Sequence, residues 1–207
     1  MTRGDAATKR PPTLSAEVAP PTPAGAVAQL AQAATPPPLA DSRSEHLAYV
    51  ALGANLADPL AQVRAAGRAL ASVPDCRLLR LSSLYRTAPV GNRSIRGQSD
   101  FINAVAALYT RLSPAQLLDA LFAIERRFGR RREYHHAPRT LDLDLLLYDE
   151  RIVDCQRLRV PHPRMHLRAF VIAPLLEIAP QALIPGRGRA AAWLPAVSSQ
   201  SIERLAE

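Results

Sequence analysis

The hydrophobic and polar positions follow strand-like and helix-like periods in turn from about residue 46 to residue 149. The apolar run from Leu47 to Leu52 predicts a strand, and a loop is expected at Gly53 to Asn55. Asp58 then predicts the N-cap of a helix with Pro59 in its first turn, where a proline loses no hydrogen bond. The apolar face of this helix is expected at Leu60, Val63, Gly67 and Leu70.

The middle of the chain predicts two strands joined by a loop and then a second helix. The run LLRLSSLYRT predicts one long strand that ends near Thr87, and FINAVAALYTRL predicts another. Between them, APVGNRSIRGQSD is rich in turn-forming residues. Ser113, Pro114 and Gln116 predict a capping-box start for the second helix. The apolar face of that helix is expected at Leu117, Leu121, Ile124 and Phe128.

A strand in LDLDLLLYD completes the order β-α-β-β-α-β, and VIAPLLEIAP predicts a third helix and its end. The order of the first six elements is that of a ferredoxin-like fold. We therefore predict an α+β fold with a ferredoxin-like core, in which a mainly antiparallel sheet is flanked by helices.

The first 45 residues have a different composition from the rest. They are rich in Ala, Pro, Thr and Ser and contain no aromatic residue. Such a segment buries too little apolar surface to offset the entropy cost of ordering it. We predict a disordered tail over residues 1–45 and one folded domain over residues 46–207.

Length and composition exclude several classes of protein. The 207 residues suffice for one full core, and 48% of them are hydrophobic. There is no apolar run of membrane-spanning length and no secretory signal pattern at the N-terminus, so a cytoplasmic protein is expected. Cys76 and Cys155 are far apart and have no metal-ligand spacing, which predicts two reduced structural cysteines.

The net charge of +8 lies outside the tail, whose charges balance. Arginine is densest in the segment ERRFGRRREYHHAPR, which implies an anionic partner or a solvated surface. A codon bias toward arginine is the simpler explanation for the scattered arginines, because the chain has only one lysine, Lys9.

Two aspartates stand out in the strand RTLDLDLLLYD. The strand period places Leu141, Leu143 and Leu145 on one face and both Asp142 and Asp144 on the other. Two carboxylates side by side repel each other unless a cation lies between them, and carboxylate pairs suit magnesium. The alternative is an ordinary polar outer face, and the pattern alone does not separate the two.

The arginines favour phosphate chemistry, because guanidinium groups match phosphate oxygens in two-pronged hydrogen bonds. Arg139 precedes Asp142 by three residues. No glycine-rich phosphate loop of the G-x-x-x-x-G-K-[ST] type occurs. Any phosphoryl transfer would therefore depend on arginines and metal.

The run APRTLDLDLLLY resembles the signature of the 6-hydroxymethyl-7,8-dihydropterin pyrophosphokinases. The resemblance continues through ALGANL, SSLYRTAPVG, DFINAVA, the IE-x-x-x-GR segment and VPHPRMHLRAF, in the family's order. It covers about Ala48 to Gly188. It implies an ATP:pterin diphosphotransferase of folate biosynthesis that uses two magnesium ions and releases AMP. Its partners would be ATP and the pterin, with no nucleic acid and no membrane, and a monomer is expected.

The resemblance also implies roles for individual residues. Asp142 and Asp144 would bind magnesium, and Arg130 and Arg139 would engage the transferring phosphates. The pterin pocket would be lined by Thr87, Val90, Phe101, Asn103 and Phe170, with the two phenylalanines stacking on the ring. The nucleotide would contact Glu125, Arg132, Leu145, Arg157, His162 and Arg168.

The chain departs from the family's pattern in three places. His136 stands where a tryptophan is often found, and Arg159 where some members have threonine. The loop after Gly91 is longer and carries Arg93 and Arg96. These departures leave open any stacking at His136, the nucleotide contact near Arg159 and the task of the two loop arginines.

Two other functions fit parts of the pattern. A basic α+β domain could be a nucleic-acid-binding module, although no aromatic-rich ribonucleoprotein strand occurs. A nucleotide hydrolase or nucleotidyltransferase could use the same pair of aspartates. Salt-dependent RNA binding would indicate the first, and nucleotide cleavage without pterin would indicate the second.

Overall fold

The computed structural model describes residues 44–89, 99–129 and 140–206. All of them belong to one compact unit, Ala40–Glu207. The predicted tail lies almost entirely outside the described residues, so its disorder stays a prediction.

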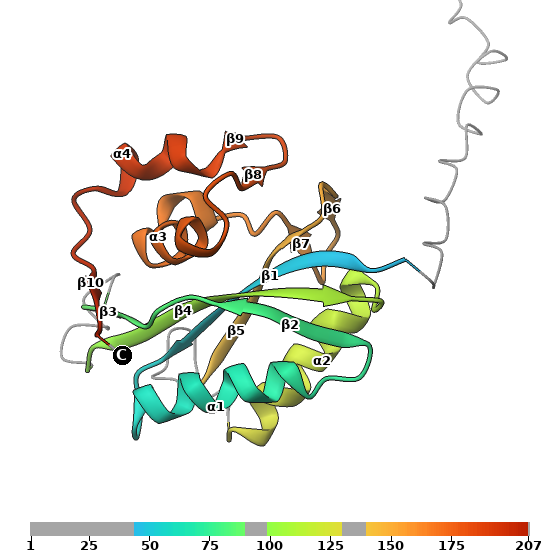
Figure 1. Cartoon of the computed structure of the whole chain (residues 1–207), viewed down its shortest axis with the longest axis horizontal. Coiled ribbons are helices and arrows are strands. Elements are labelled where there is room, and N and C mark those ends of the chain that lie inside the picture. The colour runs from blue at the N-terminus through green and yellow to red at the C-terminus, as the bar shows by residue number, and fades with distance from the viewer. Residues whose placement is uncertain (1–43, 90–98, 130–139, 207) are drawn as a thin grey trace, which may run out of the picture. The chain divides into compact units, whose positions relative to one another are not determined.

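The main sheet is antiparallel in every pairing (Figure 1). Its strand order is β10-β3-β4-β1-β5, with β2 also pairing with β4. The bounds of these strands are β1 His46–Ala54, β2 Cys76–Leu81, β3 Tyr85–Thr87, β4 Phe101–Thr110, β5 Asp142–Tyr148 and β10 Glu203–Arg204. With β2 and β3 counted as one edge, this is the ferredoxin-like arrangement that the sequence predicts.

Helices α1 (Pro59–Ala71) and α2 (Pro114–Arg127) cover one face of the sheet (Figure 1). Both predicted starts are confirmed: Asp58 accepts from the Ala61 N–H, and Ser113 and Gln116 form the capping box. Val63, Leu70, Leu117 and Leu121 pack with alternate residues of β1, β4 and β5 into a hydrophobic core. These local signals fix where each helix begins and which face it buries.

Helix α3 (Ala169–Ile178) lies on the opposite face, confirming the predicted third helix (Figure 1). A second apolar cluster forms there between Val105, Leu146, Leu147, Ile172 and Leu175. Short elements complete this side: strands β6 Val153–Asp154, β7 Arg159–Val160, β8 Leu183–Ile184 and β9 Gly188–Arg189, helix α4 Leu194–Val197, and two 3-10 turns, Met165–Leu167 and Ala190–Trp193.

Two boundaries differ from the sequence prediction. The predicted long strand over residues 78–87 is broken between Leu81 and Tyr85, because the Ser82 hydroxyl accepts the Val105 N–H that would otherwise continue the ladder. Gly53 and Ala54 belong to β1 rather than to a loop, because they pair with Asn103 and Ile102 of β4. Within the described residues, no helix is long and apolar enough to cross a membrane.

Candidate active site

Strand β5 places its two aspartates on the α3 side of the sheet. Leu141, Leu143 and Leu145 are buried in the core below, which confirms the predicted alternation. Asp142 and Asp144 alternate with them and remain partly accessible. The carboxylates therefore lie on the face that is not filled by α1 and α2.

A row of residues crosses the sheet and links Asp142 to the candidate pterin residues. Asp142 pairs with Gly53, Gly53 with Asn103, and Asn103 with Tyr85. Neighbouring strands are about 4.8 Å apart, so the backbones of Asp142 and Asn103 lie about 10 Å apart. A small bicyclic substrate held at Asn103 could thus present a substituent toward the aspartates.

Gly53 also lies in the candidate site, between Asn103 and Asp142, although the sequence predicts a loop at this position. A Cβ at this position would lie 3.2 Å from the Asn103 Oδ1 atom, closer than ordinary contact. The glycine thus leaves room for the amide of Asn103. The repeated small residues of ALGANL were the signal that could have indicated this close approach.

The candidate pterin residues on β3 and β4 are brought together. Thr87 pairs with Phe101, and the Asn103 Nδ2 atom donates to the Thr87 Oγ1 atom at 3.0 Å. Asn103 and Thr87 are both 5% exposed, and their mutual bond holds the amide in one orientation. Phe101 is half-buried at the start of β4, so its ring is accessible in part.

Phe170 approaches from the other side, on the first turn of α3. It is half-buried and packs against the second apolar cluster. The Arg168 guanidinium lies 5.4 Å from the centre of its ring, within the range of a cation–π contact. Phe170 and Phe101 thus come from opposite layers, as a stacking pair around a flat ring requires.

His162 and Arg168 both face Asp144. The His162 Nε2 and Arg168 Nη1 atoms each lie 3.9 Å from the Asp144 Oδ2 atom. The His162 N–H donates to the Leu146 carbonyl at 2.9 Å, next to the point where the pairing of β1 and β5 shifts by one residue. This backbone bond holds the histidine beside the end of the aspartate pair.

The imidazole of His162 is neutral at neutral pH. Burial and the nearby charges of Arg168 and Arg164 lower its pKa to about 4. The Arg164 N–H donates to the Nδ1 atom at 3.3 Å, so the Nε2 atom carries the proton. His162 therefore offers one N–H donor toward the space beside Asp144, which suits a phosphate oxygen.

Three further candidates for the nucleotide lie in different settings. Glu125 is 2% exposed, and its carboxylate accepts the Leu143 N–H of β5 at 2.8 Å. Leu145 has its side chain in the core, on the face opposite the aspartates. Arg157 is exposed on the β6–β7 hairpin and pairs with Asp119 of α2. Nucleotide contacts of all three stay predictions.

Several predicted positions lie outside the described residues: Val90, Arg93, Arg96, Arg130, Arg132, His136 and Arg139. Arg159, the other departure from the family pattern, is exposed and pairs with Asp154 at 2.8 Å. A direct nucleotide contact from Arg159 would require this pair to open.

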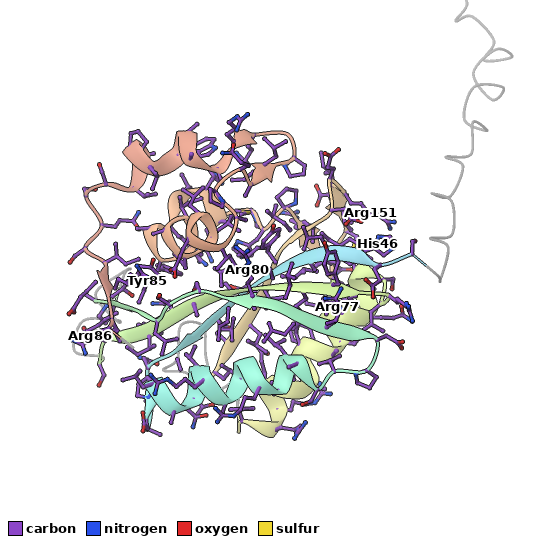
Figure 2. All side chains as sticks on the ribbon, in the orientation of Figure 1. His46, Arg77, Arg80, Tyr85, Arg86 and Arg151 are labelled. Carbon is purple, nitrogen blue, oxygen red and sulfur yellow. The ribbon has the colours of Figure 1, made fainter. Side chains whose placement is uncertain are left out.

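Several arginines of the described surface have local partners, among them Arg77, Arg86 and Arg151, which Figure 2 labels. Arg77 pairs with Glu45 and stacks over the Tyr109 ring, and Arg151 lies over the Tyr148 ring. Arg86 pairs with Glu203. These contacts account for part of the positive charge without any external ligand.

The donor set fits a hard divalent cation that is shared with a substrate. Among the described residues, no group of three or more His, Cys, Asp or Glu side chains gathers as a metal site. The protein ligands offered here are therefore the two carboxylates of β5. Magnesium commonly takes one or two carboxylates and fills its other positions with water and phosphate oxygens.

Comparison with known sequences identifies the family. The model of the 7,8-dihydro-6-hydroxymethylpterin-pyrophosphokinase family matches residues 49–180. The chain belongs to this family. The matched range contains the β1–β4–β5 row, His162, Arg168 and Phe170, so every described candidate residue lies within the part of the chain that matches this pyrophosphokinase family.

Curated members of the pyrophosphokinase family are similar to this chain over most of their length. The 2-amino-4-hydroxy-6-hydroxymethyldihydropteridine pyrophosphokinase of Pseudomonas aeruginosa is 47% identical over 157 residues, which are 76% of this chain and 95% of the relative. The Haemophilus influenzae protein of the same name is 46% identical over 138 residues, 67% of this chain and 84% of the relative.

Solved structures of the family share the fold at low sequence identity. A Plasmodium falciparum HPPK-DHPS triple mutant with pteroate matches with a TM-score of 0.58 and 11% identity. The match covers 80% of this chain and 47% of that one, so this chain spans about half the length of that protein. At this identity the likeness shows the fold alone.

Proposed function

We propose that this chain transfers the diphosphate of ATP to the hydroxymethyl group of 6-hydroxymethyl-7,8-dihydropterin and releases AMP, a step of folate biosynthesis. One observation carries the proposal: family membership coincides with a strand row that joins a buried amide, Asn103, to a carboxylate pair, Asp142 and Asp144. The amide suits a polar heterocycle, and the carboxylates suit metal-bound phosphate.

The pterin would bind between the sheet and α3. Phe101 and Phe170 would stack on its two faces, and Asn103 would hydrogen-bond its polar edge. Burial of Asn103 and its hydrogen bond to Thr87 support this role. An amide that is already held in one orientation can bind one edge of the ring without a further loss of side-chain entropy. The hydroxymethyl substituent would then point along the row toward Asp142.

The reaction forms a bond between the hydroxymethyl oxygen and the β-phosphorus of ATP. The bond from that phosphorus to the oxygen it shares with the α-phosphate breaks, AMP leaves with this oxygen, and the hydroxyl proton is released to solvent. Little covalent chemistry falls to the protein, so its residues act by alignment and charge compensation. His162 and Arg168, which flank Asp144, would hold the phosphate oxygens from one side. Arg130 and Arg139 would act on the transferring group.

We also propose that the reaction depends on magnesium. Asp142 and Asp144 would hold two ions, which neutralise phosphate charge when bound. Their common face and partial accessibility support this assignment. Glu125, Arg132, Leu145 and Arg157 remain candidates for the nucleotide, and Val90 for the pterin. A monomer and a cytoplasmic location remain expectations from sequence.

The test is product analysis with purified protein, ATP, magnesium and 6-hydroxymethyl-7,8-dihydropterin. AMP and the pterin diphosphate ester should appear together in equal amounts. Omitting the pterin or adding a chelator should stop both. AMP or ADP formed without pterin would instead indicate a nucleotide hydrolase, and equal rates with and without chelator would refute the magnesium assignment.

A further inference from the structure

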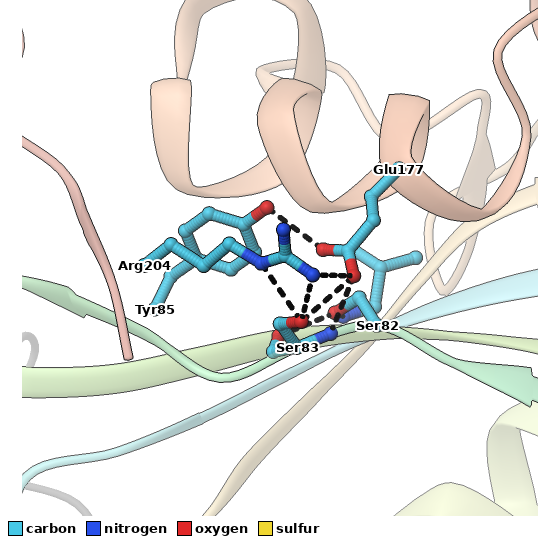
Figure 3. A network of polar contacts seen from close by, with 6 residues as sticks. Ser82, Ser83, Tyr85, Glu177 and Arg204 are labelled. Atoms are coloured by element: carbon cyan, nitrogen blue, oxygen red, sulfur yellow. Dashed lines mark hydrogen bonds and ion pairs between the residues drawn. The ribbon is translucent and has the colours of Figure 1, made fainter. Parts of the chain in front are cut away.

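The carboxylate of Glu177, near the end of α3, receives hydrogen bonds from three side chains and one backbone amide (Figure 3). Its Oε1 atom accepts from the Ser83 N–H at 3.1 Å, the Ser83 hydroxyl at 2.8 Å and Arg204 at 3.1 Å. Its Oε2 atom accepts from the Tyr85 hydroxyl at 2.7 Å. Two elements of the sheet edge, β3 and β10, are thus tied to one helix through a single side chain.

The chain is irregular where Ser83 lies, which explains why its amide is free to reach the helix. Between Leu81 and Tyr85 the edge strand leaves its ladder with β4, and Ser82 takes over the bonding to Val105. The Ser83 N–H then points toward α3 instead of toward a neighbouring strand. Irregular stretches of an edge strand, such as bulges, re-aim side chains next to functional sites.

Glu177 and Phe170 share one side of α3. They are seven residues apart, which is close to two helical turns, or roughly 10 Å along the axis. Phe170 packs into the cluster under the helix, and Glu177 bonds to the sheet edge. A helix fixed at Glu177 therefore presents Phe170 at a set height and rotation above β4.

Tyr85 connects Glu177 of α3 to strand β4, which carries Asn103. It pairs directly with Asn103, and two residues further along the same face Thr87 pairs with Phe101. Tyr85 is 8% exposed and lies between the sheet and the α3 layer (Figure 2). The bond from Tyr85 to Glu177 thus sets the spacing between the strand that carries Asn103 and the helix that carries Phe170.

We propose that Glu177 is a positioning residue for the pterin, acting through Tyr85 and Ser83 to hold Phe170 at stacking distance from the Asn103 row. This inference rests on the proposed function, because it assigns the pterin to the space between these residues. Arg204 contributes from the sheet edge by donating to both Ser83 and Glu177. Glu177 itself does not touch the substrate in this proposal.

Tyr85→Phe is the sharpest test, because it removes only the hydroxyl that bonds Glu177. We expect the Kd of 6-hydroxymethyl-7,8-dihydropterin to rise roughly tenfold, within the range of coupling through packed side chains. The Kd of a non-hydrolysable ATP analogue should change less than about twofold, and kcat at saturating pterin should be retained. Calorimetric titration of each ligand, beside steady-state kinetics, gives these values.

Arg86→Ala is the matched control. It breaks the Arg86–Glu203 ion pair between β3 and β10 but leaves the hydrogen bonds of Glu177 intact. The pterin Kd should therefore stay at the wild-type value. Glu177→Ala removes both acceptor oxygens and should lose at least as much pterin affinity as Tyr85→Phe. The double variant should lose no more than Glu177→Ala alone, because the Tyr85 hydroxyl has then already lost its acceptor.

A merely structural network would lower the melting temperature and leave the two ligand affinities unchanged or reduced equally. Folded Tyr85→Phe with a pterin Kd within about twofold of wild type would overturn the inference, even if Glu177→Ala does not fold. Failure of the proposed function itself would be visible in the wild-type protein, which would neither bind the pterin nor form the diphosphate ester.

Discussion

At the scale of single residues, Asp142 and Asp144 combine an electrostatic cost with a proposed task. Their backbones lie about 7 Å apart on one strand face, where two unit charges at an effective dielectric near 20 repel by about 2 kcal/mol. Arg168 offsets part of this near Asp144. Two carboxylates side by side on one strand face are expected where a cation is to be bound.

Asp142→Asn should abolish nearly all diphosphate transfer and leave the metal-free protein as stable as wild type or slightly more stable. The substitution removes one of two repelling charges and one proposed metal ligand, while side-chain volume is conserved. Product assays and thermal melts without metal measure the two effects. Asp144→Asn is the poorer choice because it also removes the charge that faces His162 and Arg168.

Adding magnesium with a non-hydrolysable ATP analogue separates a metal site from a polar surface. Wild type should gain melting temperature by mass action, and Asp142→Asn should gain much less. Intact turnover in Asp142→Asn, or equal stabilisation of both proteins, would contradict the metal assignment.

At the scale of elements, the sequence correctly predicts the features that depend only on residues close together in the chain. Asp58 with Pro59 and Ser113 with Gln116 are short-range capping signals, so both helix starts are predicted correctly. The alternation of Asp142 and Asp144 with buried leucines likewise needs only the strand period. The order β-α-β-β-α-β follows from these local elements.

The features that were missed depend on distant partners. The break after Leu81 requires Val105, and the assignment of Gly53 to β1 requires Asn103 of β4. Strand β10 has only two residues, too few to show a period, and it pairs with β3 from more than a hundred residues away. Glu177 lacks any sequence signal, because its partners Ser83 and Tyr85 come from the opposite end of the domain.

Glu125 links helix α2 to strand β5 through a buried hydrogen bond. Its carboxylate on α2 accepts the Leu143 N–H, which lies between the two aspartates of β5. Glu125→Ala should reduce the free energy of unfolding by roughly 1–3 kcal/mol, because a buried amide loses its acceptor. Urea denaturation measures this change.

Glu125→Gln is the matched variant, since its amide oxygen can still accept from Leu143. Most of the stability should therefore be retained. A large increase in the KM for ATP in this folded variant would support the predicted nucleotide contact of Glu125. Equal destabilisation by Gln and Ala would show that the carboxylate charge, rather than the hydrogen bond, stabilises β5.

At the scale of the whole molecule, the candidate site draws on segments that are far apart in the chain. Its described residues come from β1, β3, β4 and β5 and from the stretch between His162 and Phe170. The family match begins at residue 49, inside β1. Activity should therefore depend on the integrity of the sheet and of α3, and not on the Ala- and Pro-rich segment before them.

Deleting residues 1–43 should leave both turnover and melting temperature nearly unchanged. The segment has no amphipathic pattern that would anchor it to the core, and the deletion keeps Glu45 with its ion pair to Arg77. Deleting residues 1–48 is the matched control, because it removes His46 and Leu47, which both bond to Asp149, at 2.7 Å and 2.8 Å. It also removes three residues of β1 that pair with β4, so this longer deletion should lower the melting temperature markedly. Thermal melts and product assays on the two truncations decide the matter. A loss of several degrees or of most turnover in the shorter truncation would show that the N-terminal segment contributes to the fold or to the site.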